Sequence, residues 1–417
     1  MAITDINEYT HLTESDVEAL GAELDALRRE IESDRGVRDA TYLRRTIRAQ
    51  RVLEVTGRIA LLGSRNRFFW WSGTALLSAA KIIENMELGH NIMHGQWDWM
   101  NDPEVHSTSW EWDMVCYSGH WKHSHNYIHH KYTNVMDMDH DIGYRLLRVT
   151  RDEEWQWKHS YQVVANLFLA ATFEWGIGLH DIELKDYLEG KKPAEIAVPQ
   201  IKDFSKKIAR QMAKDFVIFP LLSGKAARKT LTANLTANLA RNLWAYLVIF
   251  CGHFPDGAEK FTEESLVDET QGQWYLRQML GSANFNAGPA MAFMSGNLCY
   301  QIEHHLFPDL PSNRYADISV RVRQLCEKYD LPYTTGPILV QYWQTFRTIA
   351  KLSLPDKYLT ATADDAPETA SEKRFAGLRA AAADRGKRIV AAGEGRREGL
   401  KTAIAEVKAR RKALRAG

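Results

Sequence analysis

The 417-residue chain contains only four cysteines, which lie far apart and form no CxxC pair: Cys116, Cys251, Cys299 and Cys326. Their number and spacing argue against a zinc knuckle, a rubredoxin-like site and the disulfide framework of a secreted protein. The N-terminal residues are rich in acidic side chains and contain no apolar segment of the kind that a signal peptide requires. We therefore expect the protein in the cytoplasm or at the cytoplasmic face of a membrane.

The chain also lacks a net charge, because 53 Lys and Arg residues balance 53 Asp and Glu residues. This balance does not point to nucleic acid as a partner. The mean hydropathy of -0.38 is low for a protein that crosses a membrane many times. The composition therefore allows a few membrane segments beneath a large polar part, and the 13 Trp and 16 Tyr residues suit a membrane interface.

Long apolar runs are few. The strongest are residues 68–83, 163–180 and 231–254, and a Gly- and Ala-rich run follows at 285–298. The first run is shorter than the roughly 20 residues that a membrane-spanning helix needs, so we interpret it as one long helix that leaves the bilayer and continues to His94. Together the runs predict an all-α fold, an integral membrane helical bundle of about four spans with a cytosolic helical cap.

Polar segments flank this core. Residues 13–48 predict a surface helix that opens with a capping box at Thr13 and Asp16, and an arginine-rich interfacial helix continues to Gly63. We divide the chain into N-terminal cytosolic or interfacial helices (1–66), a membrane domain (67–360) and a basic cytosolic tail (361–417). The composition of the tail favours a mobile segment over an arm that binds nucleic acid.

Histidine is abundant where cysteine is scarce. The stretch from His120 to Asp141 contains six histidines, and neutral imidazole is the commonest protein metal ligand. His125 and His129 are four residues apart and share one face of a helix. His130 points about 100° away around the axis and can reach a second ion nearby. For this stretch alone, a solvated histidine-rich tract is the alternative.

Two further clusters weaken that alternative. His90 and His94 lie one helical turn apart at the end of the first apolar helix, and Glu87 lies about one turn before them. His304 and His305 repeat the adjacent pair after the fourth run. Each cluster lies at the end of an apolar segment or just beyond one, so the intervening segments can return the chain to the same side of a membrane.

The number of histidines indicates the kind of site. His253 ends the third apolar run as an outlier, and a structural role is its simpler interpretation. With His253 included, eight histidines are too many for one ion of common geometry but suit two five- or six-coordinate irons. Zinc would require four ligands, and copper would usually recruit Cys or Met.

The motifs HxxxH, HxxxHH and QxxHH follow one another in this order, with YTN and DxD after the second and LFP after the third. This order resembles the membrane fatty-acid desaturases, and the match is strongest to bacterial acyl-CoA Δ9 desaturases of mycobacterial type. It covers most of residues 40–360. The sequence departs from the family pattern in a weak first span before the first motif, and it has no HPGG haem motif.

The resemblance implies a diiron centre on the cytosolic side of the cell membrane. Carried over by motif, the metal ligands are His90, His94, His125, His129, His130, His304 and His305, and His253 matches an extra ligand of related acyl-CoA enzymes. Gln301 stands where some relatives have histidine, so it either ligates weakly or orients a neighbour. The other histidines are assigned no metal: His120, His123 and His140 as supporting or surface residues, and His11, His106, His159 and His180 without a ligand argument.

The implied reaction is the O2-dependent insertion of a cis double bond, at Δ9, into a long saturated acyl-CoA, converting stearoyl-CoA to oleoyl-CoA. Removing hydrogen from an unactivated methylene needs a strong oxidant, to which thiolate ligands would be vulnerable. Only an apolar tunnel that bends at the irons can set the position, because the substrate has no polar group there. The sequence has no GxGxxG and no iron–sulfur cysteine set, and the resemblance implies NADPH acting through a separate reductase.

Two other functions remain open. A hydroxylase, ketolase or conjugase on the same scaffold would be distinguished by its products. A membrane metal-binding protein without redox chemistry would have histidines lining its spans, whereas these cluster at helix ends.

The histidine motifs also constrain topology, because the chain between His130 and His304 must cross the bilayer an even number of times. If the runs at 163–180 and 231–254 each crossed once, the basic loop at 206–229 would lie outside, against the positive-inside rule. We therefore expect each run to dip in and return, or to hold two short legs. The loop then stays in the cytoplasm, where its Lys and Arg side chains can meet an anionic coenzyme A headgroup.

Overall fold

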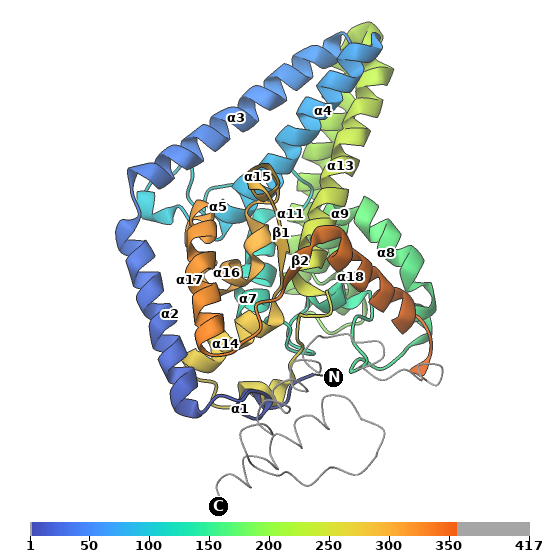
Figure 1. Ribbon diagram of the computed structural model, residues 1–417. Helices are drawn as coiled ribbons and strands as arrows, with labels where there is room; N and C mark the ends of the chain where they lie inside the picture. Colours follow the sequence, from blue (N-terminus) through green and yellow to red (C-terminus); the bar gives the residue numbers. More distant parts are fainter. Residues whose placement is uncertain (1, 357–417) are drawn as a thin grey trace, which may run out of the picture.

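The computed structural model describes residues 2–356 and is mostly helical (Figure 1). Within this range the only strands, β1 (Asn284–Asn286) and β2 (Thr335–Pro337), form a three-residue parallel ladder. The all-α prediction therefore holds apart from this short pair. The predicted basic tail at 361–417 lies outside the described residues.

The N-terminal region forms α1 (Ile6–Tyr9), α2 (Glu14–Asp34) and α3 (Val37–Leu62). The predicted capping box is confirmed, because the Thr13 hydroxyl accepts a hydrogen bond from the Asp16 N–H and the Asp16 carboxylate accepts one from the Thr13 N–H. The prediction of a single helix over 13–48 is wrong. The chain breaks at Gly36, whose φ of −177° is extended, and α3 leaves in a new direction.

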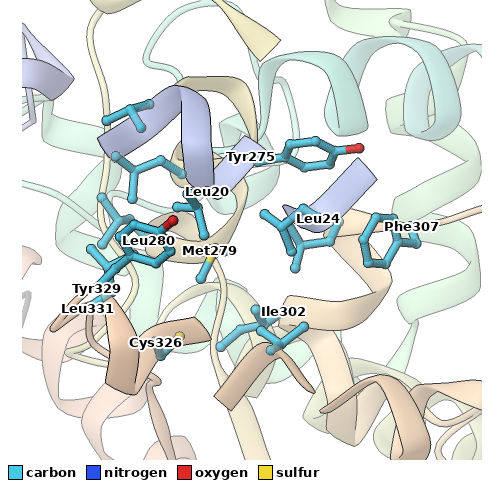
Figure 2. Packing of buried hydrophobic residues seen from close by; sticks show 14 of the residues in the cluster. Leu20, Leu24, Tyr275, Met279, Leu280, Ile302, Phe307, Cys326, Tyr329 and Leu331 are labelled. Atoms are coloured by element: carbon cyan, nitrogen blue, oxygen red, sulfur yellow. The ribbon is translucent and has the colours of Figure 1, made fainter. Parts of the chain in front are cut away.

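α2 packs against α14 (Gln271–Gly281), and both cover α16 (Gln301–Leu306) and its surroundings in one apolar core (Figure 2). Leu20 and Leu24 meet apolar side chains from α14 and from Ile302 on α16. A Cβ on Gly21 would lie 2.9 Å from the Cα of Gly272, so the two helices approach at their backbones. This core holds the segment that carries the third histidine motif.

α3 and α4 (Arg67–Ile83) run side by side and, with α13 (Ala227–His253), form an arm that projects from the rest of the molecule (Figure 1). α4 continues directly into the π-helix η1 (Glu84–His90) and α5 (Asn91–Met93). This confirms the prediction of one long helix that ends at His94. The arm exposes large apolar side chains: Val52, Val55, Ile59, Leu62, Phe68, Phe69 and Trp71.

The apolar run at 163–180 is not the single helix that the sequence predicted. It divides into α8 (Gln162–Ala171) and α9 (Phe173–Asp181), which meet at Thr172. The Asn242 side-chain amide donates to the Ala171 carbonyl at the break, at 3.0 Å. A Cβ on Gly176 would come within 2.4 Å of the Leu169 side chain, so glycine permits α9 to fold back close to α8.

Among residues 2–356, no single helix has both the length and the apolar content to cross a membrane. One bent pair, Trp157–Ala171 with Phe173–Asp181, meets both requirements when its legs are taken together, with a bend of 100° between them. The run at 285–298 holds β1 and the six-residue helix α15 (Pro289–Met294) in place of a span. The prediction of about four spans is therefore not confirmed.

The remaining helices connect these parts. The α-helices are α6 (Ser118–Trp121), α7 (His130–Tyr132), α10 (Leu184–Leu188), α11 (Ala194–Met212), α12 (Phe219–Leu222), α17 (Tyr315–Lys328) and α18 (Ile338–Leu352). Two further π-helices are η3 (Lys122–His129) and η6 (Ala213–Ile218). Short 3-10 turns are η2 (Asp98–Met100), η4 (Ile142–Arg145), η5 (Trp157–Tyr161), η7 (Gly224–Ala226), η8 (Glu263–Leu266), η9 (Leu298–Tyr300) and η10 (Ser312–Arg314).

Candidate metal centre

The eight histidines predicted as metal ligands come together in the interior of the molecule. They are carried by η1 and the turn after α5 (His90, His94), by η3 and α7 (His125, His129, His130), by the last residue of α13 (His253) and by α16 (His304, His305). Ring centroids of neighbouring histidines lie 4.5–5.6 Å apart. Residues more than 200 positions apart in the sequence thus share one site.

Two of the contributing segments are π-helices, which occur mostly as short insertions in α-helices and often at functional sites. η1 ends at His90, and η3 ends at His129. The chain before α16 approaches η1 at Gly296, which has a φ of +68°. A Cβ there would lie 2.3 Å from the Met86 carbonyl oxygen, so only glycine allows this approach.

The candidate ligand atoms of the histidines fall into two groups, each with its atoms within 4.8 Å of one another, and a third group of the same spread joins His125 and His129 to Asp141. The first group contains His90, His94, His125 and His304, and the second contains His129, His253 and His305. His130 belongs to neither group and lies between them. Its ring stacks on that of His305 at 4.5 Å and meets that of His94 edge-on at 4.6 Å. This arrangement suits two neighbouring metal ions.

Two carboxylates orient histidines of the second motif. Nδ1 of His129 lies 2.9 Å from an oxygen of Asp139, and Nδ1 of His125 lies 3.3 Å from an oxygen of Asp141. The second oxygen of Asp141 lies 3.0 Å from Nε2 of His180. A carboxylate at Nδ1 fixes the ring and its tautomer and leaves Nε2 available to a metal.

Uncharged side chains orient the histidine rings of the third motif. Nδ1 of His304 lies 3.2 Å from the Tyr315 hydroxyl, and Nδ1 of His305 lies 3.1 Å from the Gln278 side-chain oxygen. In the first motif, Nδ1 of His90 lies 3.0 Å from the side-chain oxygen of Asn91. The rings of these histidines are therefore oriented by hydrogen bonds from outside the ligand set.

The opposite ring nitrogens have no partner. Nε2 is buried without a hydrogen bond in six of the eight residues: His94, His125, His129, His130, His304 and His305. In His253 the unpaired atom is Nδ1, because Nε2 lies 3.0 Å from the side-chain amide nitrogen of Gln301. Buried polar atoms are nearly always paired, so a cluster of unpaired imidazole nitrogens that face one another fits metal ions.

The protonation of these rings agrees with metal binding. Burial lowers the pKa of His90 to about 3 and holds the pKa values of His94, His130 and His304 well below their usual range. These imidazoles are therefore neutral at physiological pH, as ligation requires. His129 differs: burial opposes its charged form, but the carboxylate of Asp139 raises its pKa above the ordinary value.

Other residues near the histidine motifs lie outside the set of eight histidines and make contacts of their own. Gln301 contacts His253, which agrees with the alternative that it orients a neighbour. Glu87 accepts hydrogen bonds from the Tyr42 and Ser312 hydroxyls and from the Asn297 amide, so it ties three segments together. The rings of His120 and His123 lie against Tyr117 and Tyr127, and His140 lies 3.5 Å from Glu183. These three histidines are outside both ligand groups.

A family comparison agrees with this geometry. The family model described as fatty acid desaturase matches residues 67–337, which hold all eight histidines. The chain belongs to the fatty acid desaturase family. Its histidine cluster therefore lies inside the part of the chain that defines the family.

Curated relatives of this desaturase match it over its whole length or over about two thirds of it. It is 60% identical over 421 aligned positions to the NADPH-dependent stearoyl-CoA 9-desaturase of Mycobacterium tuberculosis, covering 100% of this chain and 97% of the relative. It is 25% identical over 270 positions to the sn-1 linoleoyl-lipid 6-desaturase of Arthrospira platensis (63% and 72% of the two chains). It is 27% identical over 304 positions to the acyl-lipid (8-3)-desaturase of Physcomitrium patens (67% and 60%).

In this desaturase a narrow cavity reaches the histidines. His90, His125 and His253 line one side together with Gln301. The remaining wall is largely apolar and includes Met86, Trp112, Met114, Phe173, Ile177, Ile249 and Leu298. A methylene group in this cavity would lie beside the ligand groups and away from water.

Sequence reasoning missed several residues of the site. Asp139 and Asp141 were visible as the DxD motif, but without a role, and His180 was dismissed although it contacts Asp141. The DxD motif after the second histidine cluster is the local signal that could have pointed to them. Gln278 and Tyr315 belong to no motif, and only the folded structure brings them to the third histidine pair.

Proposed function

We propose that this desaturase inserts a cis double bond at the 9-position of the acyl chain of stearoyl-CoA and so forms oleoyl-CoA. The observation that carries the proposal is the 60% identity along the whole chain with an NADPH-dependent stearoyl-CoA 9-desaturase. The apolar wall of the cavity beside the histidines supports it, because such a wall suits a hydrocarbon chain.

The reaction removes two hydrogens from adjacent methylene groups: –CH2–CH2– + O2 + 2 e⁻ + 2 H⁺ → –CH=CH– + 2 H2O. We assign the electrons to NADPH through a separate reductase, since the sequence has neither GxGxxG nor an iron–sulfur cysteine set. Two iron ions held by His90, His94, His125, His129, His130, His253, His304 and His305 would supply the oxidant for this step.

The chain's own residues position the reactants. Asp139 and Asp141 fix the rings of His129 and His125, so that Nε2 of each points away from its carboxylate. Trp112 and Phe173, in the apolar part of the cavity wall, exclude water from the acyl chain. The position of the double bond then depends on how far the chain can advance along this wall.

We place the site on the cytosolic side of the cell membrane. Support comes from large apolar side chains exposed on the arm and on two packed helices, α8 (Val164, Leu167, Phe168) and α18 (Leu339, Val340, Trp343). Large apolar side chains exposed on neighbouring helices suit a lipid bilayer. Lys207 on α11, in the segment predicted to be cytoplasmic, pairs with Glu111 at 2.7 Å, close in sequence to the cavity residue Trp112.

Two measurements test the proposal. The chain is expressed with a reductase in a desaturase-deficient host, and the lipids are analysed for oleate. A hydroxy or keto acid in place of oleate would assign the hydroxylase or ketolase alternative. The purified protein should contain about two irons per chain, and zinc alone would favour a metal-binding protein without redox chemistry.

A further inference from the structure

A second, larger apolar recess lies at the bend between α8 and α9. It has a volume of about 850 Å³, and its lining is mostly apolar, including Phe168, Leu169, Trp175, Leu179, Leu184 and Leu188. Four charged side chains also line it: Arg145, Glu183, Lys185 and Glu189. We call this recess the outer groove. Its lining suits a hydrocarbon chain.

α9 separates the outer groove from the cavity at the histidines. Phe173, Ile177 and Asp181, spaced four residues apart, line the inner cavity. Trp175, Gly176, Leu179 and His180 face the groove. The partition is therefore one helix thick.

Tyr144 is the residue that lines both spaces. Its ring lies between Phe173 and Phe250, at 5.8 Å from each, and meets His180 at 5.4 Å. The ring therefore belongs to the wall of the groove and to the wall of the cavity that His125 and His253 line.

The backbone that carries Tyr144 is strained. Gly143, Tyr144 and Arg145 have φ values of +57°, +53° and +54°, a left-handed region that residues with a Cβ rarely adopt. Strain of this kind is concentrated at active sites, clamps and switch regions. The strained turn begins two residues after Asp141, whose carboxylate holds Nδ1 of His125.

The inner cavity is small for an acyl chain. Its volume is about 40 Å³, whereas a single water needs roughly 10–15 Å³ by the same kind of measure. An acyl chain that reaches the histidines must therefore displace part of the wall.

We propose that the outer groove is the entrance for the substrate's saturated acyl chain, and that Tyr144 is the gate and specificity-determining residue between the groove and the metal centre. This rests on the proposed function. Tyr144 lines both the groove and the histidine-lined cavity, and this shared wall favours the acyl substrate over a membrane lipid as the occupant of the groove.

Kinetics of the iron-loaded enzyme with its reductase test the gate. Leu179→Trp fills the groove, and Leu243→Trp is its control, because Leu179 and Leu243 are 43% and 45% exposed and Leu243 lies outside the groove. Leu179→Trp should raise KM for stearoyl-CoA by about tenfold or more, and Leu243→Trp should not. Tyr144→Ala should change the preference among acyl chains of 14, 16 and 18 carbons, whereas Tyr144→Phe should keep it. Wild-type KM and chain-length preference in both Leu179→Trp and Tyr144→Ala would overturn the proposal.

A binding experiment tests the entrance independently of the desaturation reaction. A stearoyl-CoA that carries a photoreactive diazirine in its chain is crosslinked to the purified protein, and the modified peptides are identified by mass spectrometry. Crosslinks at residues 144–146 and 168–188 that excess stearoyl-CoA removes support the entrance. Crosslinks only elsewhere, or ones that phospholipid removes and stearoyl-CoA does not, overturn it. A wild-type protein that crosslinks as expected but forms no oleate would contradict the proposed function alone.

Discussion

Both carboxylate oxygens of Asp139 face Nδ1 of His129, at 3.0 and 2.9 Å, and both side chains are inaccessible to solvent. Asp139 also accepts backbone hydrogen bonds from Asn134 at 2.7 Å and from Asp141 at 2.9 Å. The carboxylate is thus fixed by the loop that follows the second motif. The ring of His129 takes its orientation from a residue that binds no metal itself.

Asp139→Asn should lower iron affinity and desaturation by about 10- to 100-fold, because removing such a supporting partner loosens the ligand. Iron content and oleate formation are measured on the purified variant. Asp137→Asn, an exposed position two residues away, serves as the control and should behave as wild type. Equal losses in both variants would mean that the loop, and not the carboxylate at His129, is what matters.

His253→Ala tests the ligand that sequence motifs supported least. His253 belongs to the smaller ligand group, with His129 and His305, so its loss should leave about one iron per chain and lower activity by at least about 100-fold. Metal analysis and lipid analysis report the two effects. His123→Ala, at an exposed ring stacked on Tyr127, should retain both. Full iron in His253→Ala would remove this residue from the ligand set.

The depth of the arm in the membrane is testable by cysteine labelling. The exposed Arg51 lies 11 residues before the end of α3, or about 16 Å along the helix. An arm that crossed the roughly 30 Å hydrocarbon core would place this charge near its middle. We therefore expect no labelling of Lys206→Cys or Lys225→Cys from outside intact cells.

The four native cysteines are buried, which keeps the background of this experiment low. Labelling of Lys225→Cys alone would mean that the arm crosses and places its basic tip outside. Labelling of Lys206→Cys would mean that the whole basic loop is external, contrary to the topology favoured above.

Stability should depend on pH through Glu87. Burial raises the pKa of this carboxyl group from 4.5 to about 7, so the folded state binds its proton more tightly than the unfolded state. The stabilisation is fully present below about pH 4.5 and is lost as pH rises through 7. One pKa unit corresponds to about 1.36 kcal/mol, so the loss is on the order of 3 kcal/mol.

Thermal unfolding of purified wild type and Glu87→Gln between pH 5 and pH 8 measures this effect. The midpoint of wild type should fall more steeply with pH than that of Glu87→Gln. Glu104→Gln, at an exposed position, should parallel wild type. Parallel curves for wild type and Glu87→Gln would show that Glu87 does not titrate in this range.

The helical spacing placed seven of the eight histidines in three clusters, because the members of each cluster lie one turn apart or adjacent on a helix. His253 was assigned to the site only through the resemblance to the desaturases. The capping box at Thr13 and the long helix that ends at His94 could likewise be predicted from neighbouring residues in the sequence. What the local sequence could not supply were the partners from distant segments. Gln278 and Tyr315 become neighbours of the third motif only after α14 and α17 pack on α16.

The errors in the predicted helices have a similar cause. The run at 163–180 is mostly apolar, with Glu174 as its one acidic residue, and no Gly or Pro marks a break at Thr172. The break is stabilised by Asn242, 71 residues from the Ala171 carbonyl that it binds. By contrast, the end of α2 could have been predicted from Gly36. The prediction of one helix over 13–48 extended the apolar periodicity past this glycine.

Because η1 and η3 are π-helices, the direction in which their histidines point depends on the extra residue in the helical turn as well as on the spacing of the motif. Deleting one residue from η1, such as Leu88, would let the segment return to an ordinary α-helix. Everything after the deletion would turn by about 100° relative to α4. His90 and His94 would then face away from His125 and His304, although the chain would still contain every histidine and the same HxxxH motif. The extra residue in the turn sets the helical phase of the first motif, so an insertion or deletion in this helix would displace both histidines even though it removes neither.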